Sequence, residues 1–176
     1  MYKRQLNIEV NHAILAKHSF EHEIAYALAN DIFGSIDINR GDYLVGWDTD
    51  QFPNNTEELL LPFYYLFKNQ GLGSGGLNMD AKIRRQSIDP EDLFYAHIGA
   101  MDTCARALLA VERMINDGSY EEFLQKRYEN WTHNKELMSS ASLEGIYEKV
   151  KSEDINPQPQ SGRQEYLENL LNSFIE

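Results

Sequence analysis

The sequence predicts an α/β fold with a parallel sheet, followed by a mostly helical C-terminal extension. Three short apolar segments each carry an acidic residue near their end, and each is followed by a stretch with helical spacing of apolar residues. No strand pattern occurs after about residue 117. Because alternating strands and helices are typical of consecutive βα units, we expect the three strands to pair in parallel.

The three predicted strands share one alternation of apolar and polar side chains. They cover residues 6–10, 34–38 and 76–81. In each strand the apolar residues take one parity, and the other parity includes Glu9, Asp37 or Asp80. Because successive side chains point to opposite faces of a strand, each strand should turn an apolar face to the helices and a carboxylate the other way. If the strands line a barrel, the carboxylates face its interior.

A helix is predicted after each strand. The three helices cover residues 20–31, 56–69 and 90–117. Pro62 should kink or end the second helix unless it lies in the first turn, because proline lacks a backbone N–H. The third has the clearest boundaries: Asp89 suits the N-cap and Pro90 the first helical position. Gly118 suits the end of that helix.

The C-terminal sixty residues differ from the rest of the chain. Helical patterns cover residues 120–131 and 163–174, and a loop is predicted over residues 156–162, which are rich in proline and glutamine. An extension with few apolar runs has little core of its own. We therefore expect residues 118–176 to form a helical arm that lies on another surface, such as a neighbouring subunit, and residues 1–117 to form the α/β part.

Composition excludes several classes of protein. The formal net charge is −12 and the pI about 4.8, which argues against binding to nucleic acid because that requires a basic patch. No segment approaches the ~18 consecutive apolar residues of a membrane span. The chain has one cysteine, Cys104, so an internal disulfide is impossible. The N-terminus lacks the pattern of a signal peptide, and we expect a cytoplasmic protein.

Polar side chains at the predicted strand ends indicate a metal site. Five carboxylates and one imidazole can converge there: Glu9, His12, Asp37, Asp48, Asp50 and Asp80. Five like charges repel strongly unless cations neutralise them. Mg²⁺ and Mn²⁺ prefer oxygen ligands, and an imidazole shifts the preference toward Mn²⁺ or Co²⁺. Two cations that share a bridging carboxylate would use this number of ligands.

Ordinary interpretations remain open for each residue taken alone. A single aspartate at a strand end is more often a cap or loop residue, and His12 alone favours a loop or packing role. His18 and His22, near a helix start, are interpreted as structural. Lys82 belongs either to a surface run with Arg84 and Arg85 or, because it shares the parity of Asp80, to the site.

Four long motifs resemble the C-terminal part of xylose isomerase. They are NIEVNHAILAKHSFEHE from residue 7, GSIDINRGDYLVGWDTDQFP from residue 34, GGLNMDAKIRRQS from residue 75 and DPEDLFYAHIGAMD from residue 89. The resemblance runs from about Leu6 to Glu165 and so covers nearly the whole chain. It implies a (β/α)₈ barrel with a C-terminal arm that embraces a neighbouring subunit.

The resemblance also implies a reaction and a role for each site residue. The family interconverts D-xylose and D-xylulose, and D-glucose and D-fructose, with two divalent metals, usually Mg²⁺, Mn²⁺ or Co²⁺. Glu9 is similar to the carboxylate that bridges both metals, and Asp37 and Asp80 to ligands of the metal that holds the sugar. His12, Asp48 and Asp50 are similar to the remaining ligands of the second metal.

The chain departs from the family because it contains the last three βα units and lacks the earlier ones. The missing units would carry the family's upstream histidine, its lysine and one glutamate ligand. The catalytic residues are therefore unknown here, and Lys82 is the one candidate for a position near the substrate. We expect the chain by itself to be inactive. A non-catalytic metal-binding or assembly module that needs a partner chain is the alternative. A metal-dependent epimerase or endonuclease of the same superfamily is disfavoured by the motifs.

Overall fold

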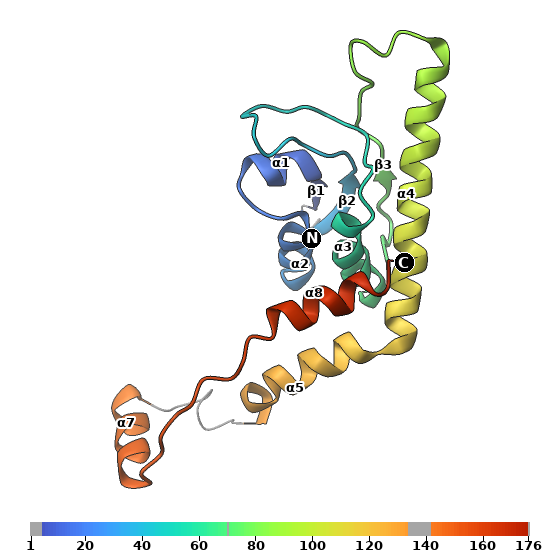
Figure 1. Cartoon of the computed structure of the whole chain (residues 1–176). Coiled ribbons are helices and arrows are strands. Elements are labelled where there is room, and N and C mark those ends of the chain that lie inside the picture. Colours follow the sequence, from blue (N-terminus) through green and yellow to red (C-terminus); the bar gives the residue numbers. More distant parts are fainter. Residues whose placement is uncertain (1–4, 70, 134–141, 176) are drawn as a thin grey trace.

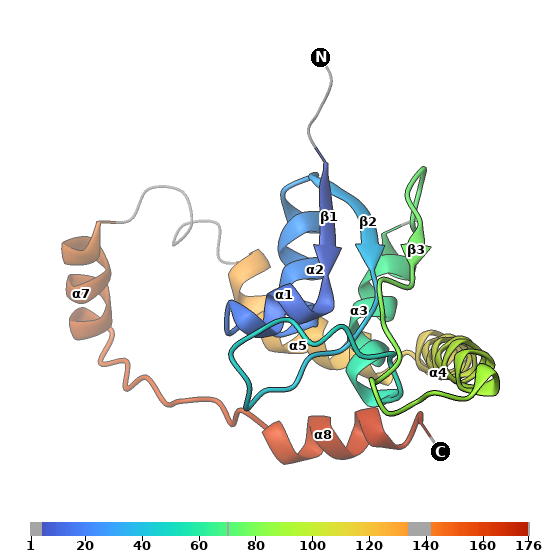
Figure 2. The ribbon, with the colours of Figure 1, turned by 90° about the horizontal axis from the view of Figure 1, so that it is seen from above.

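The computed structural model describes residues 5–69, 71–133 and 142–175. Its centre is a three-stranded sheet whose strands are β1 (Leu6–Glu9), β2 (Phe33–Asp37) and β3 (Leu77–Asn78). The strands lie in the order β1-β2-β3, and both pairs are parallel (Figure 2). The predicted α/β class with a parallel sheet is therefore confirmed.

The register of the sheet brings its polar ends together. Glu9 lies opposite Asp37 in the neighbouring strand, and Asp37 lies opposite Asn78. β3 is shorter than predicted, and Asp80 lies beyond its end. The loop before β3 passes very close to β2, since a Cβ on Gly75 would lie 1.7 Å from the carbonyl oxygen of Gly34. This close approach requires glycine in the loop.

Some of the helices cover one face of the sheet, and others lie beyond it. They are α1 (Val10–Leu15), α2 (Phe20–Ala29), α3 (Glu57–Lys68), α4 (Pro90–Asp117), α5 (Ser119–His133), α7 (Leu143–Ser152) and α8 (Gln164–Asn172). The helices α2 and α3 lie side by side against one face of the sheet, and the long helix α4 runs beside α3 (Figure 1). The short helix α1, directly after β1, was not predicted, and neither was α7.

The hydrophobic core lies between the sheet and these helices. Ile36 and Ile38 of the β2 segment are fully buried, and Ile24 of α2 and Leu60 of α3 pack into the same cluster. Burial of one such side chain contributes about 1.5–3 kcal/mol relative to exposure. The apolar parity predicted for the strands is therefore the face that the helices cover.

Pro62 was expected to break or kink its helix, and the structure contradicts the break. α3 continues from Glu57 to Lys68 with Pro62 inside it, one turn beyond the start. The proline removes a single hydrogen bond near the helix N-terminus. It is also buried next to Leu59, Leu60 and other apolar side chains of α3. Packing of this apolar face outweighs the local preference of proline against a helix interior.

The predicted ends of the longest helix are confirmed. Asp89 is the N-cap of α4, and Pro90 is its first residue. The Asp92 side chain closes the helix start, because its Oδ2 accepts a hydrogen bond of 3.1 Å from the backbone N–H of Asp89. Gly118 ends the helix in a left-handed conformation with φ 76°.

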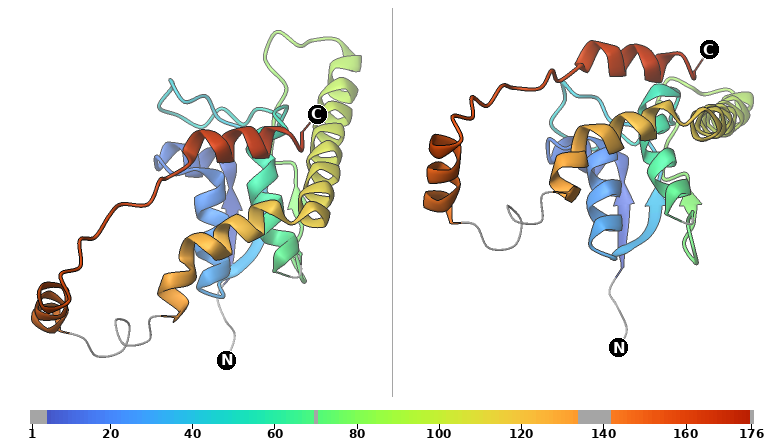
Figure 3. Two further views of the ribbon diagram at one scale, coloured as in Figure 1. Left: turned by 60° about the horizontal axis from the view of Figure 1, so that its bottom comes forward. Right: turned by 90° about the horizontal axis from the view of Figure 1, so that it is seen from below.

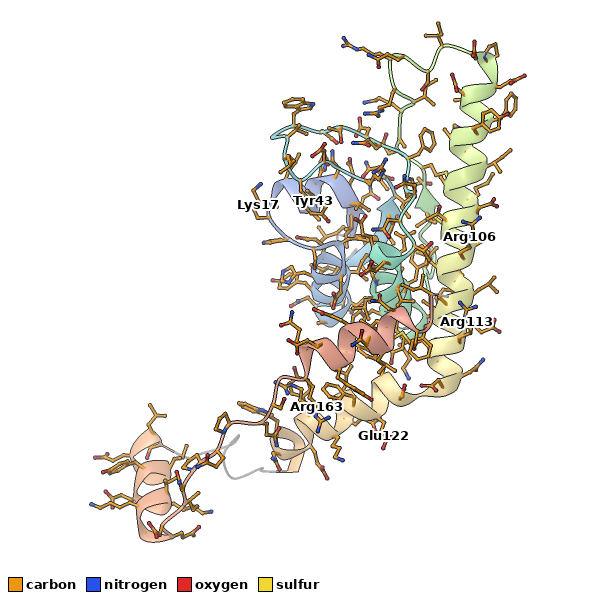
Figure 4. All side chains as sticks on the ribbon, in the orientation of Figure 1. Lys17, Tyr43, Arg106, Arg113, Glu122 and Arg163 are labelled. Carbon is orange, nitrogen blue, oxygen red and sulfur yellow. The ribbon has the colours of Figure 1, made fainter. Side chains whose placement is uncertain are left out.

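The C-terminal extension has two parts with different surroundings. α8 returns to the body of the molecule, where Phe174 is buried and Leu167 and Leu171 pack against the core. Arg113 of α4 (Figure 4) holds this end, since its Nε donates to the carbonyl oxygen of Phe174 over 3.1 Å. By contrast, α7 has no buried residue and stands apart from the body (Figure 3). The role of residues 118–176 as an oligomerisation arm stays a prediction.

Among the described residues, no helix combines the length and the apolar character that crossing a membrane requires.

Candidate metal centre

The candidate centre begins where β1 meets α1. Glu9 ends the strand in an extended conformation and is also the residue before the first helical turn. His12 lies three residues further along this turn, so its ring returns over the strand end. Its Nδ1 lies 3.1 Å from Oε2 of Glu9. The direct junction of strand and helix therefore pairs a carboxylate with an imidazole.

Glu9 belongs to two groups of metal-ligating side chains at once. One group is Glu9, Asp37 and Asp80, and the other is Glu9, His12 and Asp48. Within each group the ligand atoms lie within 4.8 Å of one another. In the second group His12 Nε2 is 3.1 Å from Asp48 Oδ2. The structure thus brings together five of the six predicted metal ligands around one shared carboxylate.

Asp50, the sixth predicted ligand, has a different partner. Its carboxylate pairs with the ammonium group of Lys82, and the backbone N–H of Lys82 donates to the Asp50 carbonyl over 2.7 Å. Lys82 therefore contacts one of the predicted ligands, while its side chain remains 73% exposed, and its place in the site stays a prediction. The hydrogen bond with Asp50 is the main cause that raises the pKa of Lys82.

The loop that carries Asp48 and Asp50 is closed at its base. Arg40 and Gln51 exchange two backbone hydrogen bonds, of 2.8 Å and 3.0 Å. Arg84, which belongs to a sequence run that could have been a simple surface feature, donates from Nη2 to the carbonyl oxygens of Thr49 and Asp50. These contacts hold Asp50 in an unusual backbone conformation with φ 42°.

One buried amide links the ends of all three strands. Asn39, 1% exposed, donates from Nδ2 to Oε1 of Glu9 over 2.8 Å and to the carbonyl oxygen of Asp80 over 3.0 Å. Its Oδ1 accepts a hydrogen bond of 2.9 Å from the backbone N–H of Asn11. Asn39 therefore fixes the shared carboxylate relative to both neighbouring segments.

Further asparagines hold the other carboxylates. Asn7 Nδ2 donates to Asp37 Oδ2 over 2.5 Å, and Asn78 Nδ2 donates to Asp37 Oδ1 over 3.2 Å. The buried Asn11 donates to Asp48, and its own Oδ1 is buried without a hydrogen-bond partner among the described residues. The carboxylates of Glu9, Asp37 and Asp48 therefore each accept a hydrogen bond from an asparagine side chain.

Sequence reasoning missed the roles of these amides, although a signal was present. Asn11 lies two residues after Glu9, and Asn39 lies two residues after Asp37. In the third strand Asn78 precedes Asp80 by the same interval. Residues two apart share a face of an extended chain, so the repeated spacing of asparagine and acid predicts amides beside the carboxylates.

The carboxylates differ in their electrostatic surroundings. Burial is the main cause that raises the pKa of Glu9, against the lowering effects of Asn39 and His12. Burial also raises the pKa of Asp48, but hydrogen bonds with Asp50 and Asn11 outweigh it and hold that pKa below its usual value. Negative charge is therefore less favourable on Glu9 than on Asp48, and a cation bound to Glu9 would stabilise that charge.

The donor set fits divalent cations. Glu9, Asp37 and Asp80 offer oxygen atoms only, and among the described residues no lysine or arginine forms an ion pair with any of them. Hard ions such as Mg²⁺ and Mn²⁺ prefer such ligands. The group with His12 adds one imidazole, which suits Mn²⁺ or Co²⁺.

Comparisons with known proteins identify relatives of this chain. The XylA2 C-terminal domain family matches residues 124–175. Over 174 residues, or 97% of the chain, 58% are identical to a xylose isomerase of Ruegeria sp. (strain TM1040). A xylose isomerase of Cereibacter sphaeroides is 59% identical over 172 residues, and one of Brucella canis is 55% identical over 173 residues. The chain spans 40% of the length of these relatives. Its resemblance to xylose isomerase is confirmed, and it fits the C-terminal part of such proteins.

Proposed function

We propose that this chain, a relative of xylose isomerases over 97% of its length, supplies the metal-holding C-terminal part of an aldose–ketose isomerase. The reaction would convert D-xylose to D-xylulose by transfer of a hydride from C2 to C1 of the open-chain sugar. The observation that carries the proposal is the position of Glu9, which is shared by two groups of metal-ligating side chains. A bridging carboxylate is what a centre with two cations requires.

Each group would hold one divalent cation, Mg²⁺, Mn²⁺ or Co²⁺. Asp37 and Asp80 would serve one of them, His12 and Asp48 the other, and Glu9 both. When bound, the two cations polarise the sugar oxygens and stabilise the negative charge that develops during the transfer.

The chain's own contribution is to hold these ligands in place. The Asn39 amide directs Oε1 of Glu9, and the Asn11 amide holds Asp48. Asp50, a ligand by family resemblance, would join the second group when its carboxylate turns from Lys82. For Lys82 we propose only this role as the counter-charge of Asp50, because Asp50 is the one site residue whose side chain it contacts among the residues that the structure describes.

We also propose that the three βα units form part of a (β/α)₈ barrel. Three neighbouring parallel strands in sequential order are what a barrel segment contains, and a full barrel needs about eight. The remaining strands would close the sheet beside β1 and β3. Isomerase activity would then require those strands, from the same protein or from another chain. A cytoplasmic location and assembly into oligomers through residues 118–176 are part of this proposal.

The direct experiment measures xylulose formation from D-xylose in the presence of Mn²⁺. We expect no product with the 176-residue chain alone, and product when it is combined with the rest of the barrel from the Ruegeria relative. Glu9→Gln should abolish the restored activity because both groups lose a ligand. Glu144→Gln, on the outlying helix α7, is the matched control and should leave activity unchanged. Undiminished activity of Glu9→Gln would contradict the proposed centre.

A non-catalytic assembly module is the second candidate, and one observation favours it. The outer face of α4 exposes large apolar residues, among them Phe94, Ile98, Met101 and Leu109. Exposed apolar surface of this kind marks a contact with another chain or segment. A module of this kind would bind Mn²⁺ and associate with a partner, yet would form no xylulose even with the rest of the barrel present.

A further inference from the structure

A second cluster of metal-ligating side chains lies at the start of α2, outside the candidate centre. Ligand atoms of His18, His22 and Glu23 lie within 4.8 Å of one another. The three residues come from one short segment, the turn between α1 and α2 together with the first turn of α2. None of them belongs to the carboxylate groups around Glu9. They therefore need an explanation of their own.

The backbone holds both histidines in fixed positions. Lys17 (Figure 4) adopts a left-handed conformation with φ 66°, which turns the chain so that the N–H of His18 donates to the carbonyl oxygen of Ala13 over 2.9 Å. Ser19 is the N-cap of α2, and its Oγ accepts a hydrogen bond of 3.1 Å from the N–H of His22. One histidine is thus anchored to α1 and the other to α2.

The side chains are already gathered. The rings of His18 and His22 have centroids 4.7 Å apart, and Nδ1 of His18 contacts a carboxylate oxygen of Glu23. The ring of Tyr26, one turn further along α2, stacks on His22 at 6.2 Å. Glu21 adds a second negative charge that acts on His22. Two imidazoles and a carboxylate therefore share one acidic, partly exposed surface.

We propose that His18, His22 and Glu23 form a binding site for a borderline divalent ion such as Zn²⁺, with water completing the coordination. Zn²⁺ is bound by histidine nitrogen and carboxylate oxygen at about 2.0–2.2 Å, so its ligand atoms lie roughly 3.4 Å apart. The side chains reach that spacing by rotation, since His18 is 48% exposed and Glu23 27% exposed. The oxygen-rich groups at Glu9 favour harder ions, so the two kinds of site should differ in their metal preference.

Binding at this site would join two structural elements. An ion held by His18 and by residues of α2 links the α1–α2 turn to the helix that covers the sheet. Because the ion binds the folded chain, it should raise the thermal unfolding midpoint, and this rise should increase with the concentration of free Zn²⁺. This inference is independent of the isomerase proposal, which concerns Glu9 and its neighbours.

The test uses the full chain carrying Glu9→Gln and Asp48→Asn, so that the carboxylate groups are disabled, with excess Mg²⁺ present. Zn²⁺ is titrated by calorimetry, and Co²⁺ is titrated by absorption as a probe of coordination. We expect one ion per chain and tetrahedral Co²⁺ bands. His22→Gln should weaken Zn²⁺ binding by about tenfold or more, because it removes a ligand, and the loss of residues that only hydrogen-bond to ligands already costs about that much. Glu23→Gln should weaken it in the same direction.

Two control variants separate coordination from other causes. His97→Gln alters an exposed histidine on α4, far along the chain from the cluster, and should leave Zn²⁺ binding unchanged. Glu21→Gln removes a neighbouring charge without removing a ligand and should weaken binding less than His22→Gln. Equal Zn²⁺ affinity of His22→Gln and His97→Gln overturns the proposal. So does a Co²⁺ spectrum that keeps its bands in His22→Gln.

Discussion

The two faces of the sheet are built from the same strands but are stabilised in different ways. On the helix side, Ile8, Ile36 and Ile38 lie in a continuous apolar cluster with residues of α2, α3 and α4. On the opposite side, Glu9 and Asp37 are held by specific amide donors. Burial on the first face tolerates any apolar side chain of suitable volume, whereas the second face depends on individual hydrogen bonds.

This difference has a consequence for function. The apolar face supplies stability and positions the strands, and the polar face carries close carboxylates whose mutual repulsion lowers stability. The same alternation of side chains therefore divides the sheet into a stabilising face and a face suited to bind cations. Substitutions on the apolar face should therefore mainly lower stability, and substitutions on the polar face should mainly weaken metal binding.

The largest effect on stability is expected on the apolar face. Ile36→Ala removes a fully buried side chain at the centre of the sheet. It should lower the free energy of unfolding by about 2–5 kcal/mol, through lost burial and the cavity that remains. Urea unfolding followed by circular dichroism measures the change. Ile88→Ala, at an 83% exposed position, is the control. Similar losses in the two variants would contradict the assigned core.

Asn39→Ala should have the next largest effect, on both stability and metal binding. It leaves the Asn11 N–H without its acceptor and Glu9 without its donor. We expect a loss of about 1–3 kcal/mol in the free energy of unfolding. Mn²⁺ affinity should fall by about 10–100-fold, because the shared carboxylate loses its orientation. Calorimetry tests this, with Asn30→Ala on the exposed end of α2 as the control. Unchanged Mn²⁺ affinity would contradict the proposed role of Asn39 in orienting Glu9 for the metal.

Glu9→Gln should separate the two properties. The pKa of Glu9 is raised in the folded chain, so the folded chain binds a proton on this side chain more readily than the unfolded chain does. Protonated Glu9 therefore contributes stability at acid pH, and this contribution is lost as the pH rises through the raised pKa. Glutamine removes this dependence. In metal-free buffer at neutral pH we expect the variant to be slightly more stable than the parent chain, by less than the Ile36→Ala loss. Its Mn²⁺ binding should nevertheless disappear. Thermal melts between acid and neutral pH, with and without Mn²⁺, measure both. A variant that is less stable and still binds Mn²⁺ is the contrary result.

The smallest effect is expected from Lys82→Met. Lys82 is exposed and pairs with Asp50, and such pairs contribute little to stability. The free energy of unfolding should be nearly unchanged. Mn²⁺ affinity should rise, by less than about tenfold, because Asp50 no longer has a competing cation. Lys126→Met on α5 is the matched control. A fall in affinity for Lys82→Met would show that Lys82 supports the site instead of competing with metal.

Much of the fold could be predicted from local patterns. The parity of Ile36 and Ile38 against Asp37 located the buried face, and Asp89, Pro90 and Gly118 located the ends of α4. These signals are local, since they depend on neighbouring residues and on backbone geometry. The predicted break at Pro62 was wrong because it too depended on a local signal. The local preference of proline opposes a helix, but the packing of α3 against other elements decides the outcome.

The sequence by itself determined which acidic residues can form the centre. They are one acid on the polar face of each of the three strands and two more acids in the loop after the second strand. Tertiary structure decided which of them meet. In the folded chain Glu9 belongs to both groups of ligating side chains, and the Asp50 carboxylate pairs with Lys82. Asn39 forms hydrogen bonds that connect the ends of all three strands. Tertiary structure also returned α8 to the core while α7 stayed apart. The reason is physical. Alternation of side chains repeats along one strand, but contacts between strands depend on register and on the loops that join them, which no local pattern contains.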